Sequence, residues 1–298
     1  MTKETTPRSV NILCIGAVLW DIIGRATAHM RVGSDVPGRI TRLPGGVAMN
    51  IAMALKAYGM SPAVLSAIGQ DEEGEELIRA CTRLGIDATQ AYRSEDLPTD
   101  RYMAVEGGNG LIAAVADAHS LEAAGDKILR AITQGAFKGW DGLVALDGNL
   151  KVALLEQIAR DPVFAPCDLR VAPASPGKAE RLTPYLTHKR ATIYVNLEEA
   201  SLLLHCKVSG SAEAAEALIQ NGLRRAIVTD GPNPASAATA AGTLTLTPPV
   251  VLVTRVTGAG DTFMAAHIAS EARGADGEDA LHAALEAAAI YISGESYQ

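Results

Sequence analysis

The sequence is short of aromatic residues, which make up only 4% of its 298 positions, whereas hydrophobic residues as a whole make up 48%. Aliphatic side chains and alanine-rich helices must therefore fill the core. A hydrophobic run long enough to cross a bilayer is also lacking, so we expect no transmembrane helix. Residues 1–9 are polar and contain no apolar stretch of the kind found in secretory signals. These absences favour a cytoplasmic protein.

Cysteine is scarce, and the four cysteines lie far apart, at Cys14, Cys81, Cys167 and Cys206. No CxxC pair or Cys/His cluster has the spacing of a metal site, which argues against structural zinc. Scattered cysteines are typical of small core side chains or of free thiols in a reducing compartment. They favour the same cytoplasmic location.

An excess of positive charge is missing as well, because 26 basic and 34 acidic side chains give a net charge of −8. This balance argues against nucleic acid or an anionic membrane as a partner, since both attract basic surfaces. The first expected strand ends at Gly16, and no G-x-G-x-x-G segment follows it. A Rossmann dehydrogenase is therefore unfavoured, and the expected partner is another kind of small molecule.

What the sequence does contain is an alternation of short apolar strands with helical stretches. This alternation predicts a parallel sheet covered on both faces, an α/β fold. The expected strands are 10–16, 63–68, 143–146, 169–171, 192–195, 226–229 and 249–254. The expected helices are 48–58, 71–84, 152–160, 197–204, 212–221, 262–272 and 283–293.

Two regions break this rhythm. Segments 22–43 and 89–115 contain short extended pieces separated by turn residues, which is typical of antiparallel hairpins. Together they predict a small second sheet over the C-terminal edge of the main one. An open sheet of this kind leaves edges and an apolar face that need cover.

The most informative segment, 257–261, reads Thr-Gly-Ala-Gly-Asp and joins an extended run to a helical run. The amide groups of Gly258, Ala259 and Gly260 at a helix N-terminus form a site for an anion. A carboxylate would repel a phosphate there, so Asp261 makes sense if it takes a proton from an attacking group. The alternative is a glycine-rich turn in which Asp261 only caps the helix.

A second glycine pair opens another helix, in the segment Gly45-Gly46 followed by Asn50. Glycines let the backbone approach a small ligand, and an Asn amide both donates and accepts hydrogen bonds, which suits sugar hydroxyls. The alternative is a helix start with a buried, satisfied Asn. Asp21 ends the first strand region, and open α/β sheets bind ligands beyond such strand ends. It is either a carboxylate that accepts hydrogen bonds from sugar hydroxyls or simply a turn-forming Asp.

Both glycine motifs, in this order, resemble the signatures of the ribokinase-like (PfkB) family of carbohydrate and nucleoside kinases. The resemblance extends from Val10 to about Ser293. It implies a single ribokinase-like domain over residues 1–298, folded as a three-layer α/β/α sandwich. It also implies that segments 22–43 and 89–115 form a lid over the sugar site, and that two lids pair in a homodimer.

The resemblance further implies ATP and Mg²⁺ as cofactors and a role for each matching residue. Asp261 would be the catalytic base, with Gly258, Ala259 and Gly260 around the transferred phosphoryl group. The substrate-binding candidates are Asp21, Gly45, Gly46 and Asn50, and the ATP-binding candidates are Asn196, Thr229, Gly231, Thr257, Gly258 and Gly260. Glu199 would reach Mg²⁺ through water. Taken without the resemblance, the segment from Asn196 to Glu199 is typical of a capped helix start.

Three positions depart from the family pattern. Pro232-Asn233-Pro234 replaces the usual glycine-rich continuation after Gly231, so we expect a stiffer loop. Members that need a monovalent cation often carry Asp two residues before the Thr of the Gly-Ala-Gly-Asp segment, and here that position is Arg255. A strand end that often reads Asp-Pro-x-Ser has Ala172 in place of the Asp.

Within the family, secondary matches make the chain most similar to pseudouridine kinases. They include the segments 37–52, 65–71 and 146–150. The candidates for contact with the base are Tyr102, His119, Asn149 and Lys178. The expected reaction is ATP-dependent phosphorylation of O5′ of a ribonucleoside. A kinase of a free sugar or another nucleoside, and a sensor that keeps the pocket without catalysis, are the alternatives.

Overall fold

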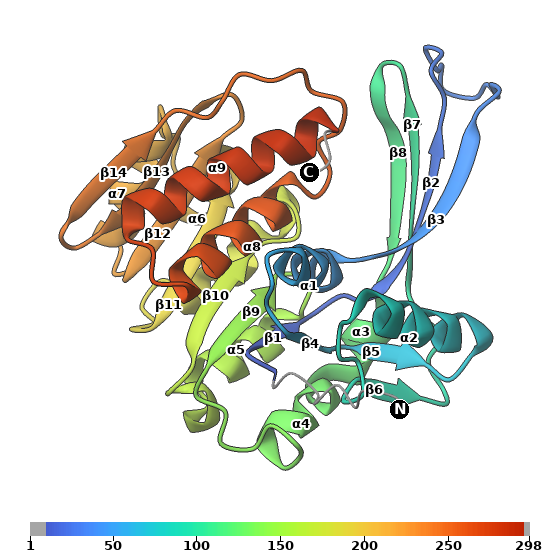
Figure 1. Ribbon diagram of the computed structural model, residues 1–298, viewed down its shortest axis with the longest axis horizontal. Helices are drawn as coiled ribbons and strands as arrows, with labels where there is room; N and C mark the ends of the chain where they lie inside the picture. Colours follow the sequence, from blue (N-terminus) through green and yellow to red (C-terminus); the bar gives the residue numbers. More distant parts are fainter. Residues whose placement is uncertain (1–9, 295–298) are drawn as a thin grey trace, which may run out of the picture.

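The computed structural model describes residues 10–294 and is built around an eight-stranded sheet (Figure 1). The strand order is β14-β13-β12-β11-β10-β9-β1-β4. The strands from β4 to β12 in this order run parallel, and β13 and β14 extend one edge as an antiparallel hairpin. Their bounds are β1 Ile12–Ile15, β4 Pro62–Leu65, β9 Leu143–Asp147, β10 Asp168–Ala172, β11 Ala191–Asn196, β12 Arg225–Asp230, β13 Asn233–Thr239 and β14 Gly242–Leu246.

Helices cover both faces of this sheet, so the expected three-layer α/β/α sandwich is confirmed (Figure 1). One face carries α1 Val47–Ala57, α8 Ala259–Ala272 and α9 Gly277–Ser293. The other face carries α5 Val152–Arg160, α6 Leu197–Leu204, α7 Ser211–Gln220 and the 3₁₀ segment η3 Pro176–Tyr185. The remaining short elements are α3 His119–Ala124, η1 Gly125–Leu129, α4 Arg130–Thr133 and η2 Pro162–Phe164. No helix in the described part of the chain is long and apolar enough to cross a membrane.

A second sheet projects away from the sandwich (Figure 1), and we call it the lid after the role that the resemblance implies. Its order is β3-β2-β7-β8, with bounds β2 Leu19–Arg25, β3 Arg39–Gly45, β7 Arg101–Gly107 and β8 Gly110–Asp117. Both expected antiparallel pairs form, and β2 joins them by running parallel to β7. The lid begins earlier than expected, at Leu19, so Asp21 lies in a lid strand and not at the end of the first strand. Residues 92–94 form β6, which pairs with β5 Ala67–Gly69 instead of joining the lid.

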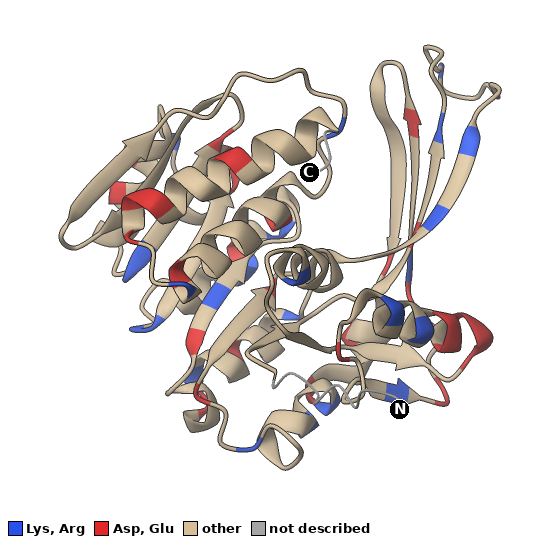
Figure 2. Cartoon of the chain, in the orientation of Figure 1, with Lys and Arg blue, Asp and Glu red and all other residues tan. Residues whose placement is uncertain are grey.

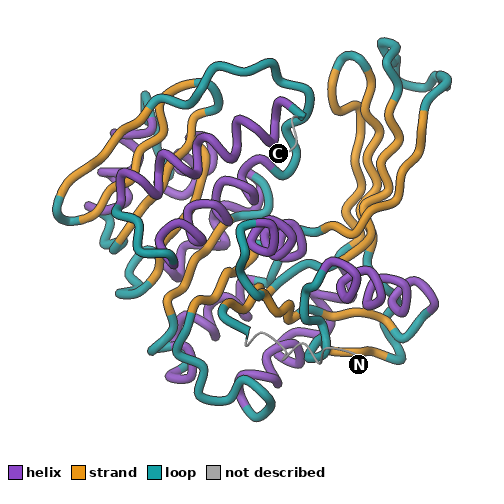
Figure 3. The backbone as a smooth tube through the Cα atoms, viewed as in Figure 1, coloured by secondary structure: helices purple, strands orange, loops and turns teal. Residues whose placement is uncertain are grey.

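The expected strand at 249–254 was wrong. These residues form an exposed irregular segment that runs into α8 (Figure 3). The β13–β14 hairpin, which the sequence analysis missed, completes that edge of the sheet. Pro248 and Pro249 have no backbone N–H to donate to a further strand. The expected strand at 63–68 is also divided, at Ser66, into β4 and β5.

The root of the lid is tied to α2 (Glu72–Leu84), whose first turn is acidic (Figure 2). The Arg101 guanidinium pairs with Glu73 at 2.7 Å, and Arg42 pairs with Glu76. Trp20 donates its indole N–H to the backbone carbonyl of Glu73 at 3.0 Å, and the Arg42 guanidinium lies 4.3 Å from the centre of the Trp20 ring. These contacts fix the base of the lid while its far end extends from the sandwich.

Candidate active site

The N-terminus of α8 has the geometry expected of an anion site. Gly258 precedes the helix with a φ of 88°, a conformation that favours glycine, and Asp261 lies in the first turn. The Ala259 N–H donates to the Val256 carbonyl at 3.1 Å. Gly258 and Gly260 therefore present the amide groups that have no protein acceptor within residues 10–294. The three expected amides are in place, but that of Ala259 is engaged within the turn.

The glycine pair before α1 lets the protein approach itself closely. A Cβ on Gly45 would lie 2.0 Å from Oδ2 of Asp21, and one on Gly46 would lie 2.5 Å from the carbonyl oxygen of Ala17. Gly46 also has a φ of 91°. The pair therefore makes room for the Asp21 carboxylate and for the turn after β1. Burial raises the pKa of Asp21 to about 6.

The two glycine motifs meet directly. Asn50, in α1, donates from Nδ2 to Oδ2 of Asp261, in α8, at 3.0 Å. Burial, together with the nearby charges of Asp147, Asp21 and Glu199, raises the pKa of Asp261 to about 7. The hydrogen bond from Asn50 opposes this rise. The result is a carboxyl group poised to exchange a proton near neutral pH, beside an anion site.

Asp147, at the end of β9, belongs to the same acidic group, although the sequence analysis did not assign it a role. It is fully buried and accepts hydrogen bonds from the Ala17 N–H at 2.8 Å and from the Asn149 N–H at 2.8 Å. A Cβ on Gly16 would lie 2.2 Å from the Cβ of Asp147. Its place at the carboxyl end of a buried strand was the available signal.

The four residues expected near a base are only partly brought together. Asn149 donates from Nδ2 to Asp147 at 3.1 Å and accepts from Lys178 at Oδ1, so its amide is held in one orientation. Tyr102 lies next to Asp21 across the β2–β7 pair, and burial followed by the Asp21 charge raises its pKa. His119 instead contacts Asp117 at 2.7 Å and is exposed at the root of the lid.

Asn196 and Glu199 form a capping box at the start of α6. The Glu199 N–H donates to the Asn196 side chain at 2.9 Å, and the Asn196 N–H donates to Oε2 of Glu199 at 2.8 Å. The capping alternative is thus correct for the local geometry, and Glu199 is near enough for its charge to contribute to the raised pKa of Asp261. Burial raises the pKa of Glu199 itself to about 7. A nearby cation would stabilise its ionised form.

Thr229 and Gly231 lie at the end of β12, beside Asn196 of β11. Gly231 has a φ of 54°, and the chain turns there into β13. Asn233 closes this turn by donating to the Asp230 carboxylate at 3.1 Å. The Pro-Asn-Pro segment therefore forms the turn into β13, before that strand begins to pair with β14 at Ala235, and the start of a strand is a position that tolerates proline.

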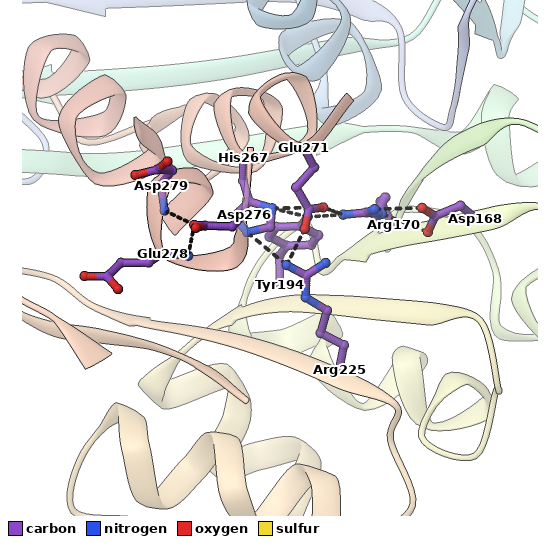
Figure 4. Close-up of polar contacts among 9 residues, drawn as sticks. All are labelled: Asp168, Arg170, Tyr194, Arg225, His267, Glu271, Asp276, Glu278 and Asp279. Carbon is purple, nitrogen blue, oxygen red and sulfur yellow. Dashed lines mark hydrogen bonds and ion pairs between the residues drawn. The ribbon is translucent and has the colours of Figure 1, made fainter. Parts of the chain in front are cut away.

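A buried polar cluster holds the C-terminal half of α8 against the main sheet (Figure 4). It comprises Asp168, Arg170, Tyr194, Arg225, His267 and Glu271. Glu271 pairs with both Arg170 and Arg225, and the Tyr194 hydroxyl contacts Nδ1 of His267 at 3.0 Å. Burial lowers the pKa of His267 to about 3, so its ring is neutral. The sequence analysis missed this cluster, which anchors the helix that carries Asp261.

Residues 10–298 match the family model of pfkB family carbohydrate kinases. The chain belongs to this family. Its phosphotransferases act on hydroxyl groups of sugars or nucleosides, so the carboxyl group and anion site at α8 lie in an enzyme of that class. Among the described residues, no group of three or more His, Cys, Asp or Glu side chains is arranged to hold a metal ion by itself.

The chain is similar to two proteins of Escherichia coli. It is 28% identical over 288 residues to the uncharacterized sugar kinase YeiI, which covers 93% of this chain and 76% of the relative. It is 26% identical over 263 residues to a pseudouridine kinase, covering 85% and 81% of the two chains. Its fold is similar to that of Arabidopsis thaliana ribokinase complexed with ribose and ATP, with a TM-score of 0.74, 17% identity, and 95% and 92% of the two chains covered.

The raised pKa of Asp261 predicts a particular dependence of the PfkB enzyme on pH. If Asp261 is the general base, it accepts a proton only when ionised, so kcat/KM should fall as the pH drops below about 7. Glu199→Gln removes a negative charge and should move this acid limb to lower pH, whereas Asn50→Ala removes a donor and should move it to higher pH. The pH profiles of the three proteins provide the test. An acid limb near the ordinary carboxyl range, at about pH 4, would contradict the assignment.

Proposed function

We propose that this chain is an ATP-dependent kinase that phosphorylates the O5′ hydroxyl of a ribonucleoside, most specifically pseudouridine. The observation that carries the proposal is the contact between Asn50 and Asp261 at the N-terminus of α8. In this contact the Asn50 amide, which would bind the sugar, donates to the Asp261 carboxyl group, which would accept the proton. Asp261 itself lies beside the anion site, in the first turn of α8. The relative named pseudouridine kinase supports the choice of substrate.

In the proposed reaction, Asp21 and Asn50 hold the ribose hydroxyls and direct O5′ toward Asp261. The Asp261 carboxylate takes the hydroxyl proton while the oxygen forms a bond to the γ-phosphorus of ATP. The bond from that phosphorus to the bridging oxygen breaks, and ADP leaves. The amides of Gly258 and Gly260 face the charge on the transferred group.

The polar groups at the ends of β11 and β12 suit the phosphates and their metal. Asn196, Thr229 and Gly231 would lie along the ATP phosphates, and Thr257 precedes the anion turn. Glu199, together with Asn196, would hold Mg²⁺ through water. Burial raises the pKa of Glu199, and a nearby cation would stabilise its ionised form. When bound, the metal would neutralise phosphate charge. The ribokinase complex with ribose and ATP supports ATP as the donor.

Discrimination between bases must come from groups outside the ribose site. Lys178 has two further N–H donors after its bond to Asn149 and would face a carbonyl oxygen of the base. Pseudouridine also exposes an N–H that uridine lacks, and an acceptor facing it would leave uridine unpaired. Such a loss corresponds to about 5- to 150-fold in specificity.

The substrate is tested by comparing kcat/KM for pseudouridine, uridine, adenosine, ribose and fructose at saturating ATP. We expect pseudouridine to give the largest value. A larger value for ribose or fructose would refute the nucleoside assignment and favour a free-sugar kinase. That second candidate is supported by the relative named as a sugar kinase, which is 28% identical.

We also propose that two lids pair in a homodimer. Ile40, Met103 and Val115 are 78%, 52% and 66% exposed, and the strand register places them on the lid face opposite Asp21 and Tyr102. Covering this apolar face would stabilise the open sheet. Light scattering should give the mass of a dimer, and Met103→Glu should give monomers. The control is Val152→Glu on α5, and a wild-type monomer at micromolar concentration would contradict the proposal.

A further inference from the structure

The segment that leads into the anion turn is fastened to the C-terminal end of α9. Thr254 donates to the Ile292 carbonyl from its N–H at 2.8 Å and from its hydroxyl at 3.0 Å. Arg255 donates from Nε to the Tyr291 carbonyl at 2.6 Å. The last carbonyls of a helix lack partners within the helix and lie at the negative end of its dipole. The Tyr291 carbonyl also accepts from the Gly294 N–H at 3.2 Å, so the Arg255 guanidinium adds a second donor and places a positive charge at the negative end of the dipole.

Tyr291 connects the C-terminal end of α9 to the anion turn. The Arg255 guanidinium stacks on the Tyr291 ring, with Cζ 3.7 Å from the ring centre. The Tyr291 hydroxyl donates to the Thr257 carbonyl at 2.9 Å, and a Cβ on Gly258 would lie 2.6 Å from that hydroxyl. These contacts link Arg255 through Tyr291 to Thr257 and Gly258, and we refer to these four residues as the clamp.

A monovalent cation does not fit this arrangement. Family members that need one often carry a carboxylate where this chain has Arg255. Here the same place holds a positively charged guanidinium that already donates to the Tyr291 carbonyl. A second cation would be repelled by the guanidinium and would have to displace it from that oxygen.

We propose that the Arg255 guanidinium is a built-in cation that positions the anion turn through Tyr291, so that turnover needs no monovalent cation. The proposal rests on the kinase function proposed above. Arg255 and Tyr291 are positioning residues in this account, because they act on the reacting groups through Thr257 and Gly258. Misplacing a catalytic group by about 1 Å can cost about 10²-fold in rate, so losing the clamp should lower kcat.

One competing role for Arg255 follows from its surroundings. It lines a cavity of about 300 Å³ together with Asn50, Gly258 and Tyr291, and from there it would contact a phosphate of ATP directly. The two roles differ in kinetics. A clamp acts on kcat, whereas a direct contact that is equal in the ground and transition states acts on KM for ATP.

The experiment compares wild type, Arg255→Ala, Tyr291→Phe and Arg273→Ala in tetramethylammonium chloride and in potassium chloride at equal ionic strength. Arg273 is a matched control, because it also donates to a backbone carbonyl, that of Tyr58, at 3.2 Å but lies at the other end of α8. Wild type and Arg273→Ala should keep the same kcat in both salts, to within about twofold. Arg255→Ala should lose about tenfold or more in kcat, and potassium or added guanidinium should restore part of it. Tyr291→Phe should lose kcat without any restoration by salt.

Stimulation of wild type by potassium of about fivefold or more would overturn the proposal, as would an Arg255→Ala variant that raises KM for ATP with kcat unchanged. The melting temperature is a readout that does not depend on activity. Potassium should raise it relative to tetramethylammonium in Arg255→Ala but not in wild type, and equal shifts in the two proteins would count against the clamp. If wild type phosphorylates no acceptor in either salt, the kinase proposal fails, and the melting temperatures still decide whether Arg255 takes the place of a cation.

Discussion

Asp261→Asn is expected to lower kcat by about 10²–10⁴-fold, the usual contribution of a general base. The change is nearly isosteric and keeps an oxygen that can accept the 3.0 Å hydrogen bond from Asn50. It removes only the capacity to take a proton and one negative charge from the acidic group. The fold should therefore survive, and the melting temperature should not fall, because the buried charge costs free energy in the wild type.

The control for this variant is Asp279→Asn, which makes the same chemical change in the exposed first turn of α9. Its kcat should equal that of wild type. Steady-state kinetics of both variants at saturating ATP and acceptor separate the two outcomes. If Asp261→Asn turns over within a few-fold of wild type, Asp261 is not the base.

Gly258→Ala should be the next most damaging change, with a loss of about 10²-fold in kcat. The added Cβ would lie 2.6 Å from the Tyr291 hydroxyl, and the residue would have to keep a φ of 88°. One of the two must move, and either movement displaces the amides that face the transferred group. Chemistry should suffer more than stability, because the strain of a left-handed residue is only about 1–2 kcal/mol.

Gly274→Ala is a matched control for this substitution. Gly274 has a φ of 92°, and a Cβ there meets nothing within 4 Å. Both variants therefore carry the same backbone strain, but only Gly258→Ala disturbs the anion turn. Equal losses of kcat in the two variants would show that the effect is general destabilisation and would remove the special role of Gly258.

Several helices and the two glycine turns of the candidate site were predictable from local features of the sequence. Helices 152–160 and 197–204 were expected at the bounds that the structure shows, because their hydrophobic periodicity is local and Asn196 caps the start of the second. The glycine turns before α1 and α8 were readable for the same reason. Each turn has one position with a positive φ, a conformation that favours glycine, and the sequence has a glycine at that position.

Features that depend on distant partners were not predictable in this way. The contact between Asn50 and Asp261 joins positions 211 residues apart, and the clamp joins Arg255 to Tyr291 across α8 and α9. Asp147 looked like one acidic strand end among several until the turn at Ala17 was seen to donate to it. The run 249–254 has the composition of a strand, but it joins no sheet within residues 10–294, and Thr254 donates instead to the Ile292 carbonyl of α9.

The buried cluster around Glu271 was not predictable for the same reason, since it also depends on distant partners. Its members come from β10, β11, β12 and α8, and each looks like an ordinary surface residue in the sequence. Only the packing of α8 on the sheet removes them from water and makes their mutual hydrogen bonds necessary. The sequence therefore indicated the candidate site residues, and the structure shows which contacts hold α8, the helix that carries Asp261, against the sheet.

The central claim is that Asp261 and the anion turn transfer a phosphoryl group from ATP to a hydroxyl group. The most direct test incubates the purified protein with Mg²⁺, ATP and one acceptor at a time, and follows both ADP and the mass of the acceptor. We predict that ADP forms only when an acceptor is present, and that the product is a monophosphate bearing the group on its primary hydroxyl, pseudouridine 5′-phosphate in the case of pseudouridine. Binding of ATP and acceptor without any phosphorylated product, across nucleosides and free sugars alike, would contradict the account and leave a sensor as the remaining reading of the site.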